Sequence, residues 1–184
     1  MMKPSAMKQA AVLGLFLSAA TSMTFAADWQ AKLKSELPAM GHRNWIVVAD
    51  AAYPKQSAPG IETVYTGGDQ LDVLEKVLKA VEKASHVSAI VLLDAELDSV
   101  SEKDAPGVTA YRARLKKLME GREPKVMLHE DIIKKLDEGS KLFNVLLLKT
   151  RLTIPYTSVF LELDCGYWSG EKEKRLRDAI AKGK

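Results

Sequence analysis

The sequence predicts an α/β protein: a single three-layer αβα domain with a mostly parallel sheet, followed by a C-terminal helix. Short apolar runs of strand length alternate with longer amphipathic segments of helical period, and no repeat or low-complexity tract interrupts them. Strands joined by helices favour right-handed crossovers, and therefore a largely parallel sheet. At 184 residues with 47% hydrophobic content, the chain is long enough for one domain with a substantial core.

The individual elements follow from period and punctuation. The expected strands are short and rich in β-branched or aliphatic residues: 45–49, 61–65, 87–93, 124–128, 142–148 and 156–163. The expected helices cover 28–40, 69–83, 108–120, 130–138 and 171–181. Asp69 is a suitable N-cap for the second helix, and Pro38 predicts an irregular last turn in the first. The polar segment 94–107 is expected to be a solvated loop.

The N-terminus has the composition of a secretory signal peptide. Lys3 and Lys8 precede an apolar run over 10–20, and residues 24–26 form a small-x-small cleavage site. We therefore expect a signal peptide over 1–26, a domain over 27–184 with a terminal helix over 170–184, and a periplasmic or secreted protein. The apolar run is too short for a comfortable membrane span, so no membrane association is expected after the signal is removed.

Composition argues against several functions. Removing residues 1–26 leaves 25 basic residues (27 − 2) against 24 acidic ones, and no basic stripe interleaved with aromatic residues, so nucleic acid is not an expected partner. Cys165 is the only cysteine, which excludes an intramolecular disulfide and a cysteine-based metal cluster. We interpret it as a small buried hydrophobic residue.

Two histidines and an aspartate stand at strand ends. His42 precedes the strand 45–49 and Asp50 follows it, while His129 follows the short strand 124–128. Tyr156 and Ser158 lie at the mouth of the last strand, where alternation predicts that they face the same side. Histidine exchanges protons near neutral pH, and open α/β sheets bind ligands beyond the carboxyl ends of their strands.

Each of these residues also has an ordinary structural interpretation. A histidine beside a helix end often caps it, and an aspartate after a strand often forms a turn. His86 at the end of a charged helix is interpreted in the same way. The acidic alternation Asp94, Glu96, Asp98 lacks the glycine and distal glutamate of a calcium loop. Gly67-Gly68 lacks the rest of a dinucleotide fingerprint, and no Gly-x-Ser-x-Gly elbow is present.

The order of these motifs resembles the D-ribose pyranase / L-fucose mutarotase family. The resemblance runs from about Leu33 to Gly166 and rests on Gly41-His42, Asp50-Ala51 with Pro54, His129-Glu130 and Pro155-Tyr156-x-Ser158. The first motif is fairly specific; the others count mainly through their order. The sequence departs from the family at Ser158, which stands where an asparagine is usual, and over 149–151, where Lys-Thr-Arg replaces Thr-Gly-Glu.

The resemblance implies a cofactor-free, metal-free isomerase that interconverts sugar anomers or pyranose and furanose rings. It implies His42, Asp50 and Tyr156 as catalytic residues, with His42 the principal acid/base, and His129 and Ser158 as substrate-binding residues. It also implies a monosaccharide partner such as ribose or fucose and a ring-shaped homo-oligomer. Three bulky side chains are candidates for the contacts between its subunits: Trp45, Phe160 and Trp168.

Two alternatives remain open from sequence. An exported carbohydrate-binding or scaffold protein could keep this fold without turnover, which the changes at 149–151 and Ser158 favour. Metal-dependent hydrolysis by His42, Asp50 and His129 is the weaker alternative.

Overall fold

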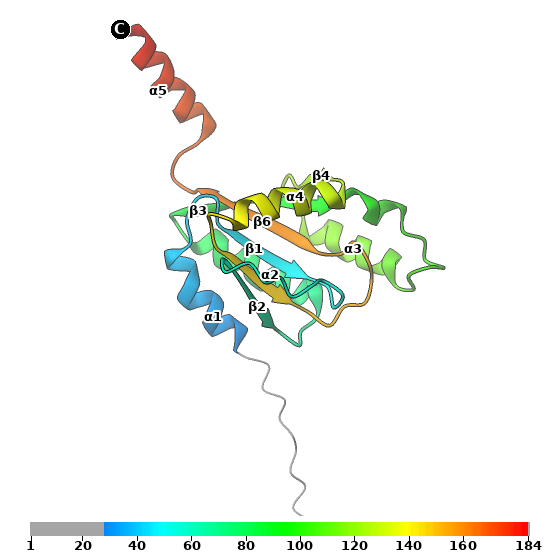
Figure 1. The fold of residues 1–184 in the computed structure, drawn as a ribbon. Helices are drawn as coiled ribbons and strands as arrows, with labels where there is room; N and C mark the ends of the chain where they lie inside the picture. The colour runs from blue at the N-terminus through cyan, green and yellow to red at the C-terminus, as the bar shows by residue number, and fades with distance from the viewer. Residues whose placement is uncertain (1–27, 184) are drawn as a thin grey trace, which may run out of the picture.

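The computed structural model describes residues 28–183, which form a six-stranded sheet with helices on both faces (Figure 1). The strands are β1 (Trp45–Ala49), β2 (Ile61–Tyr65), β3 (Val87–Asp94), β4 (Lys125–Met127), β5 (Val145–Lys149) and β6 (Val159–Cys165). The helices are α1 (Trp29–Glu36), α2 (Gln70–Lys83), α3 (Val108–Leu118), α4 (His129–Ser140) and α5 (Gly170–Lys182), with 3₁₀ helices η1 (Leu37–Ala39) and η2 (Ala95–Ser99). The predicted signal peptide, residues 1–26, lies outside the described residues. None of the helices in 28–183 is long and apolar enough to cross a bilayer.

The sheet has the strand order β2-β5-β1-β6-β3-β4. β1 and β2 both pair with β5 in parallel, and β3 pairs with β4 in parallel. β6 is antiparallel to both of its neighbours, β1 and β3, so it is the one reversed strand of the sheet. This confirms the predicted mostly parallel sheet. It also places the start of β6 at the same edge of the sheet as the ends of β1 and β3.

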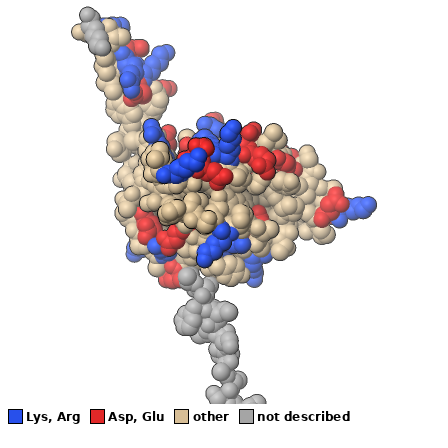
Figure 2. Space-filling model, viewed as in Figure 1, with Lys and Arg blue, Asp and Glu red and all other residues tan. Residues whose placement is uncertain are grey.

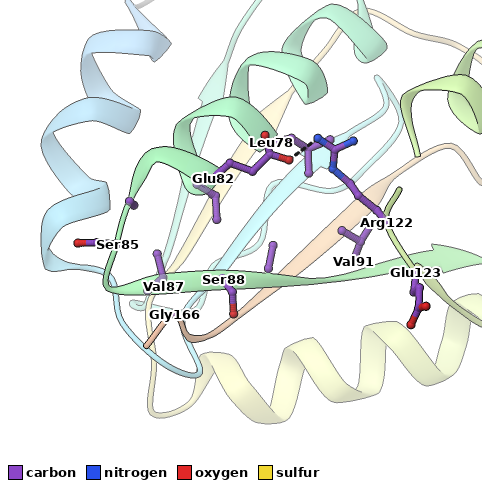
Figure 3. Close-up of a pocket in the computed structure, with 12 residues that line it drawn as sticks. Leu78, Glu82, Ser85, Val87, Ser88, Val91, Arg122, Glu123 and Gly166 are labelled. Atoms are coloured by element: carbon purple, nitrogen blue, oxygen red, sulfur yellow. Dashed lines mark hydrogen bonds and ion pairs between the residues drawn. The ribbon is translucent and has the colours of Figure 1, made fainter. Parts of the chain in front are cut away.

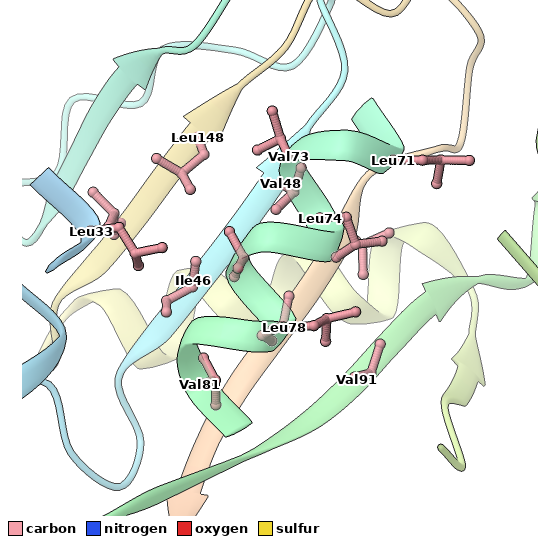
Figure 4. Close-up of a cluster of buried hydrophobic side chains, with 14 of the residues drawn as sticks. Leu33, Ile46, Val48, Leu71, Val73, Leu74, Leu78, Val81, Val91 and Leu148 are labelled. Atoms are coloured by element: carbon pink, nitrogen blue, oxygen red, sulfur yellow. The ribbon is translucent and has the colours of Figure 1, made fainter. Parts of the chain in front are cut away.

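One face of the sheet is covered by α1, α2 and α3. Helix α2 lies over β1, where Leu74, Leu78 and Val81 face Ile46 and Val48 (Figure 4). All five side chains are buried. These α2 residues follow the helical period seen in the sequence. Their burial against the sheet is the main source of the helix's stability.

The opposite face is covered by α4. Ile132 and Leu136 pack with Trp45, Val47 and Phe160, and these side chains are almost fully buried. Trp45 and Phe160 therefore belong to the core of one chain, and the prediction that they form subunit contacts is wrong. Their size and strand position give the same sequence signal for a core residue as for an interface residue.

The predicted helix ends are confirmed where a specific side chain marks them. The Asp69 carboxylate accepts hydrogen bonds from the backbone N–H groups of Leu71 (3.0 Å) and Asp72 (3.3 Å), as an N-cap does. The last turn before Met40 is the 3₁₀ helix η1, which contains Pro38. Boundaries without such markers differ from the prediction: β5 begins at Val145, and β6 begins at Val159.

Helix α5 leaves the end of β6 and extends away from the sheet (Figure 1). Ser169 caps it by accepting a hydrogen bond from the Lys172 N–H at 3.3 Å, and none of its residues is buried. Trp168, Leu176 and Ile180 are exposed large apolar side chains of this segment. Acidic and basic side chains lie close together along α5 and α4 on the face drawn in Figure 2.

Candidate functional site

Four of the five predicted site residues gather at one edge of the sheet. Asp50 directly follows β1, and His129 is the first residue of α4, directly after β4 and Leu128. Tyr156 and Ser158 precede β6, whose reversed direction brings them to the same edge. Because β6 is antiparallel, Tyr156 and Ser158 at its start lie near Asp50 and His129, which follow the parallel strands β1 and β4.

Asp50 and Ser158 form a direct pair. The Ser158 hydroxyl donates to Asp50 Oδ2 at 2.9 Å, and the Asp50 N–H lies 3.2 Å from the same hydroxyl oxygen. Asp50 Oδ1 accepts from the Ala52 N–H at 2.8 Å, which closes the turn after β1. Each carboxylate oxygen has two lone pairs, so both oxygens keep acceptor capacity for a ligand.

Ser158→Ala is expected to lower the free energy of unfolding by about 1–3 kcal/mol, since Asp50 loses a buried hydroxyl partner. Ser158 is only 2% exposed, so water does not replace the bond fully. Chemical denaturation measures the change. Ser88→Ala on the exposed part of β3 is the matched control, and an equal loss in both variants would contradict the prediction.

His129 is fixed at both its backbone and its ring. Its N–H donates to the Glu96 carboxylate, with both oxygens at 3.0 Å, and its Nδ1 lies 3.0 Å from Asp94 Oδ2. The Tyr156 ring meets the imidazole edge to face, with ring centroids 5.7 Å apart. The expectation that 94–107 is only a solvated loop is therefore wrong at its start, where η2 forms and two acids contact His129.

Asp94 is a buried carboxylate. Its side chain is 0% exposed, and its Oδ1 has no hydrogen-bond partner among the described residues. The pKa of Asp94 is raised from 3.8 to about 6, mainly by burial. His129 opposes this shift by its charge and its hydrogen bond, and the charges of Glu96 and Asp50 add to it. A desolvated carboxyl with a raised pKa beside an imidazole is typical of functional sites.

Asp94→Asn is expected to remove a pH dependence of stability. Because the pKa of Asp94 is raised on folding, its contribution is fully present below pH about 4 and is lost as the pH rises through about 6. Relative to wild type, the variant should gain about 2–3 kcal/mol between those pH values. Urea unfolding across this range measures the difference, and a difference that stays constant with pH would contradict it.

Tyr156 does not lie in a strand, and the expectation that it shares a strand face with Ser158 is wrong. It sits in the turn before β6 with φ 57°, and its side chain is 40% exposed while Ser158 is buried. A left-handed φ is costly for tyrosine and persists only where the surroundings impose it. The turn brings the tyrosine ring over His129 instead.

A buried polar network holds this turn. The Thr157 carbonyl accepts from Gln70 Nε2 at 2.8 Å and from the Tyr111 hydroxyl at 3.0 Å. Gln70 Nε2 also donates to the Val48 carbonyl at 2.9 Å, which joins the end of β1 to the turn. The Thr150 hydroxyl donates to Gln70 Oε1. Helices α2 and α3 thus fix Thr157, which follows Tyr156, and helix α2 fixes Val48, which lies two residues before Asp50.

Sequence reasoning missed Asp94, Gln70 and Tyr53 as parts of this region. Tyr53 is buried, and its carbonyl accepts from Lys149 Nζ at 2.7 Å. Burial raises the pKa of Tyr53, and the nearby charges of Asp137, Asp94 and Asp50 add to the shift. Of these three residues, only Asp94 could have been identified from the sequence. An acid that directly ends a long apolar strand is expected at the carboxyl edge of the sheet.

His42 lies at the other edge of the sheet. It precedes β1, its side chain is 59% exposed, and Nε2 lies 3.5 Å from Asp164 Oδ1. A strand of five residues is about 16 Å long, so β1 separates His42 from Asp50 within one chain. His42, Asp50 and His129 do not converge within one chain, so a single chain does not assemble the three-residue site that the metal-dependent hydrolase alternative requires. Residues 28–183 contain no group of three or more potential ligands arranged for a metal ion.

A surface pocket of about 310 Å³ lies against the site, lined by Asp50–Ala52 and Thr153–Pro155. This volume is at the lower end of the range for ligand pockets. A second pocket, of about 430 Å³, lies between the end of α2 and the start of β3 (Figure 3). It contains the Glu82–Arg122 ion pair and none of the five predicted site residues.

The fold and the site define a class: a three-layer α/β protein with a polar site at the edge where the parallel strands end. The sequence model of the RbsD / FucU transport protein family matches residues 29–164, so the chain belongs to this family. This is the D-ribose pyranase / L-fucose mutarotase family that the sequence motifs resemble. No curated protein has a sequence that matches the chain.

The chain is also similar to solved structures. The structure of RbsD from Bacillus subtilis complexed with D-ribose has a TM-score of 0.50 at 20% identity, covering 86% of this chain and 98% of that one. The fucose mutarotase from Streptococcus pneumoniae in complex with L-fucose has a TM-score of 0.48 at 22% identity, covering 72% and 91%. At these identities the likeness to the B. subtilis protein shows the fold alone.

Proposed function

We propose that this protein binds a monosaccharide such as ribose or fucose and interconverts its anomers or its pyranose and furanose rings without a cofactor. The observation that carries the proposal is the meeting of His129 with Tyr156, and of Asp50 with Ser158, at one edge of the family fold. The two relatives described above are complexed with D-ribose and L-fucose, which supports a monosaccharide as the ligand class.

The reaction needs only proton transfer and hydroxyl recognition. One group takes the proton of the anomeric hydroxyl, and another protonates the ring oxygen. The free acceptor positions on Asp50 suit sugar hydroxyls, and Ser158 orients that carboxylate. The exposed phenol of Tyr156 is suited to donate to the ring or anomeric oxygen, and His129 binds a hydroxyl beside it.

We further propose that His42 acts in the pocket of a neighbouring copy within a ring-shaped homo-oligomer. Its exposed position at the far edge of the sheet supports this, since it reaches no other predicted site residue in its own chain. A head-to-tail ring repeats one contact between unlike faces, so the edge that carries His42 would meet the next chain's Asp50 edge.

Subunit mixing tests this arrangement. His42→Ala and His129→Ala proteins are each expected to lose sugar exchange. When they are unfolded together and refolded in equal amounts, about one site in four combines an intact His42 with an intact His129, and activity returns to roughly that fraction. Sedimentation verifies assembly. An inactive mixed oligomer would contradict a site shared between copies.

Saturation-transfer NMR of D-ribose and L-fucose with the mature protein tests the proposed function. Accelerated exchange between anomeric or ring signals is the expected result. Sugar binding without faster exchange would refute the isomerase and favour the carbohydrate-binding alternative. The absence of both sugar binding and faster exchange would refute the sugar site. His86→Gln is the control for indirect effects and should leave the exchange rate unchanged.

We also propose export to the periplasm or the medium, on the basis of residues 1–26 alone. The mass of the protein recovered from a periplasmic or culture-medium fraction measures this. Cleavage after Ala26 is the expected result, and an intact N-terminus in the cytosol would contradict it.

A further inference from the structure

In the pair formed by Asp94 and His129, a buried carboxylate contacts an imidazole, and binding a sugar hydroxyl alone does not need this contact. Asp94 is buried at the end of β3, 0% exposed at its side chain, and makes one charge-assisted contact, to His129 Nδ1 at 3.0 Å. Its Oδ1 has no partner among the described residues. A buried carboxylate with an unsatisfied oxygen is destabilising, and such groups persist where they serve a site.

The contact is held rigidly from both sides. Asp94 belongs to a strand paired with β6 and β4, and His129 is anchored through its own N–H to Glu96. The imidazole is 28% exposed, so one side of the ring faces Asp94 and another reaches solvent. Tyr156 packs edge to face against the same ring.

We propose that Asp94 is a positioning residue that fixes neutral His129 as the Nδ1–H tautomer and leaves Nε2 as the unprotonated nitrogen that exchanges protons with the sugar. A carboxylate accepts but does not donate, so the nitrogen that faces it carries the proton. The inference rests on the proposed function for the sugar, but its statement about the tautomer concerns the free protein. It makes His129 a proton carrier rather than only a hydroxyl ligand.

The proton balance of ring opening fits this tautomer. Nε2 takes the proton of the anomeric hydroxyl, and the electron pair of that O–H bond forms the carbonyl. The pair of the bond between the anomeric carbon and the ring oxygen moves to the ring oxygen, which receives a proton. Nε2 or the Tyr156 phenol supplies it, and in the second case the phenol recovers a proton from Nε2. Throughout, the Asp94 carboxylate stabilises the imidazolium through Nδ1–H.

The groups around Asp94 act on the pair from several elements. Glu96 in η2 and Asp50 after β1 are acidic, and both raise the pKa of Asp94, while His129 on α4 lowers it. Burial near Asp94 and Asp50 also raises the pKa of the Tyr53 and Tyr111 hydroxyls, so both stay protonated. Because the pKa of Asp94 is raised only to about 6, Asp94 is mainly ionised at neutral pH and can accept the hydrogen bond that the tautomer requires.

The direct test is a long-range ¹H–¹⁵N spectrum of the histidine rings in the free, full mature protein at about pH 8, where imidazoles are neutral. His129 is expected to give the Nδ1–H pattern. Asp94→Leu removes the acceptor and should shift His129 toward the Nε2–H form, and Asp98→Leu on the exposed side of the same segment should not. A wild-type His129 in the Nε2–H form would overturn the proposal without any variant.

The sugar-exchange rate gives a second readout. In Asp94→Leu we expect kcat to fall about 10–100-fold, with KM within about twofold, and the acid limb of the pH profile to move. An unchanged tautomer in this variant, or an unchanged kcat beside an active wild type, would overturn the inference. An Nδ1–H tautomer in a wild-type protein that exchanges no sugar would support the tautomer assignment and refute the proposed function instead.

Discussion

Replacing Gln70 with leucine is expected to lower the free energy of unfolding by about 3–5 kcal/mol. The Gln70 side chain is 0% exposed. Its Nε2 donates to the carbonyls of Val48 and Thr157, and its Oε1 accepts from the Thr150 hydroxyl. Leucine has a similar volume, so the loss comes from the three groups left without this partner rather than from a cavity.

The same change should loosen the turn that carries Tyr156. Hydrogen exchange of the amides in 150–158 should rise more than exchange in β5, because the turn loses its contact with α2. Gln30→Leu, at an exposed position of α1, is the matched control and should change stability by less than about 0.5 kcal/mol. Equal stability of both variants under urea denaturation would show that the network contributes nothing measurable.

His129→Gln is expected to slow sugar ring exchange by about 10²–10⁴-fold if His129 is the proton carrier inferred above, the usual effect of removing a proton-transfer group. Glutamine keeps the length and the hydrogen-bonding character of the side chain, and its backbone N–H still donates to Glu96. The fold should therefore remain intact, and saturation-transfer NMR measures the rate.

His86→Gln provides the matched comparison. The His86 Nε2 lies 3.1 Å from the carbonyl oxygens of both Leu37 and Met40, so this histidine caps the end of η1. The variant should lose some stability and keep its exchange rate. If both variants kept the wild-type rate, His129 would not be a proton carrier in this protein.

The local elements could be predicted well where a residue pattern has one physical solution. The strands Trp45–Ala49 and Ile61–Tyr65 have the predicted bounds. The Asp69 cap and the irregular turn at Pro38 are also confirmed, since each depends on only a few neighbouring residues. The position of β6 between β1 and β3 could not be read from the sequence, because strand order depends on contacts between distant segments.

The site was predictable in part for the same reason. Asp50 and His129 follow parallel strands, and that rule places them at one edge. Tyr156 takes a left-handed turn imposed by Gln70 and Tyr111, which are 86 and 45 residues away in the chain (156 − 70 and 156 − 111), and alternation failed there. Asp94 looked like part of a polar loop because its burial depends on packing between β3 and α4.

Cys165 shows the same limit on a smaller scale. It was expected to be a buried hydrophobic residue, but it is half-buried at the last position of β6. The residue type indicates only the usual environment of a cysteine. Fewer side chains pack against the end of a strand than against its middle, so Cys165 stays partly exposed.

Helix α5 is attached only at its first residues, and this makes it an arm. Its 13 residues give a reach of about 20 Å beyond Ser169. The arm starts from the end of β6, where Asp164 contacts His42. A second copy of the chain that covered His42 would therefore lie beside the base of this arm, and the exposed Trp168, Leu176 and Ile180 give the arm an apolar surface with which to hold that copy.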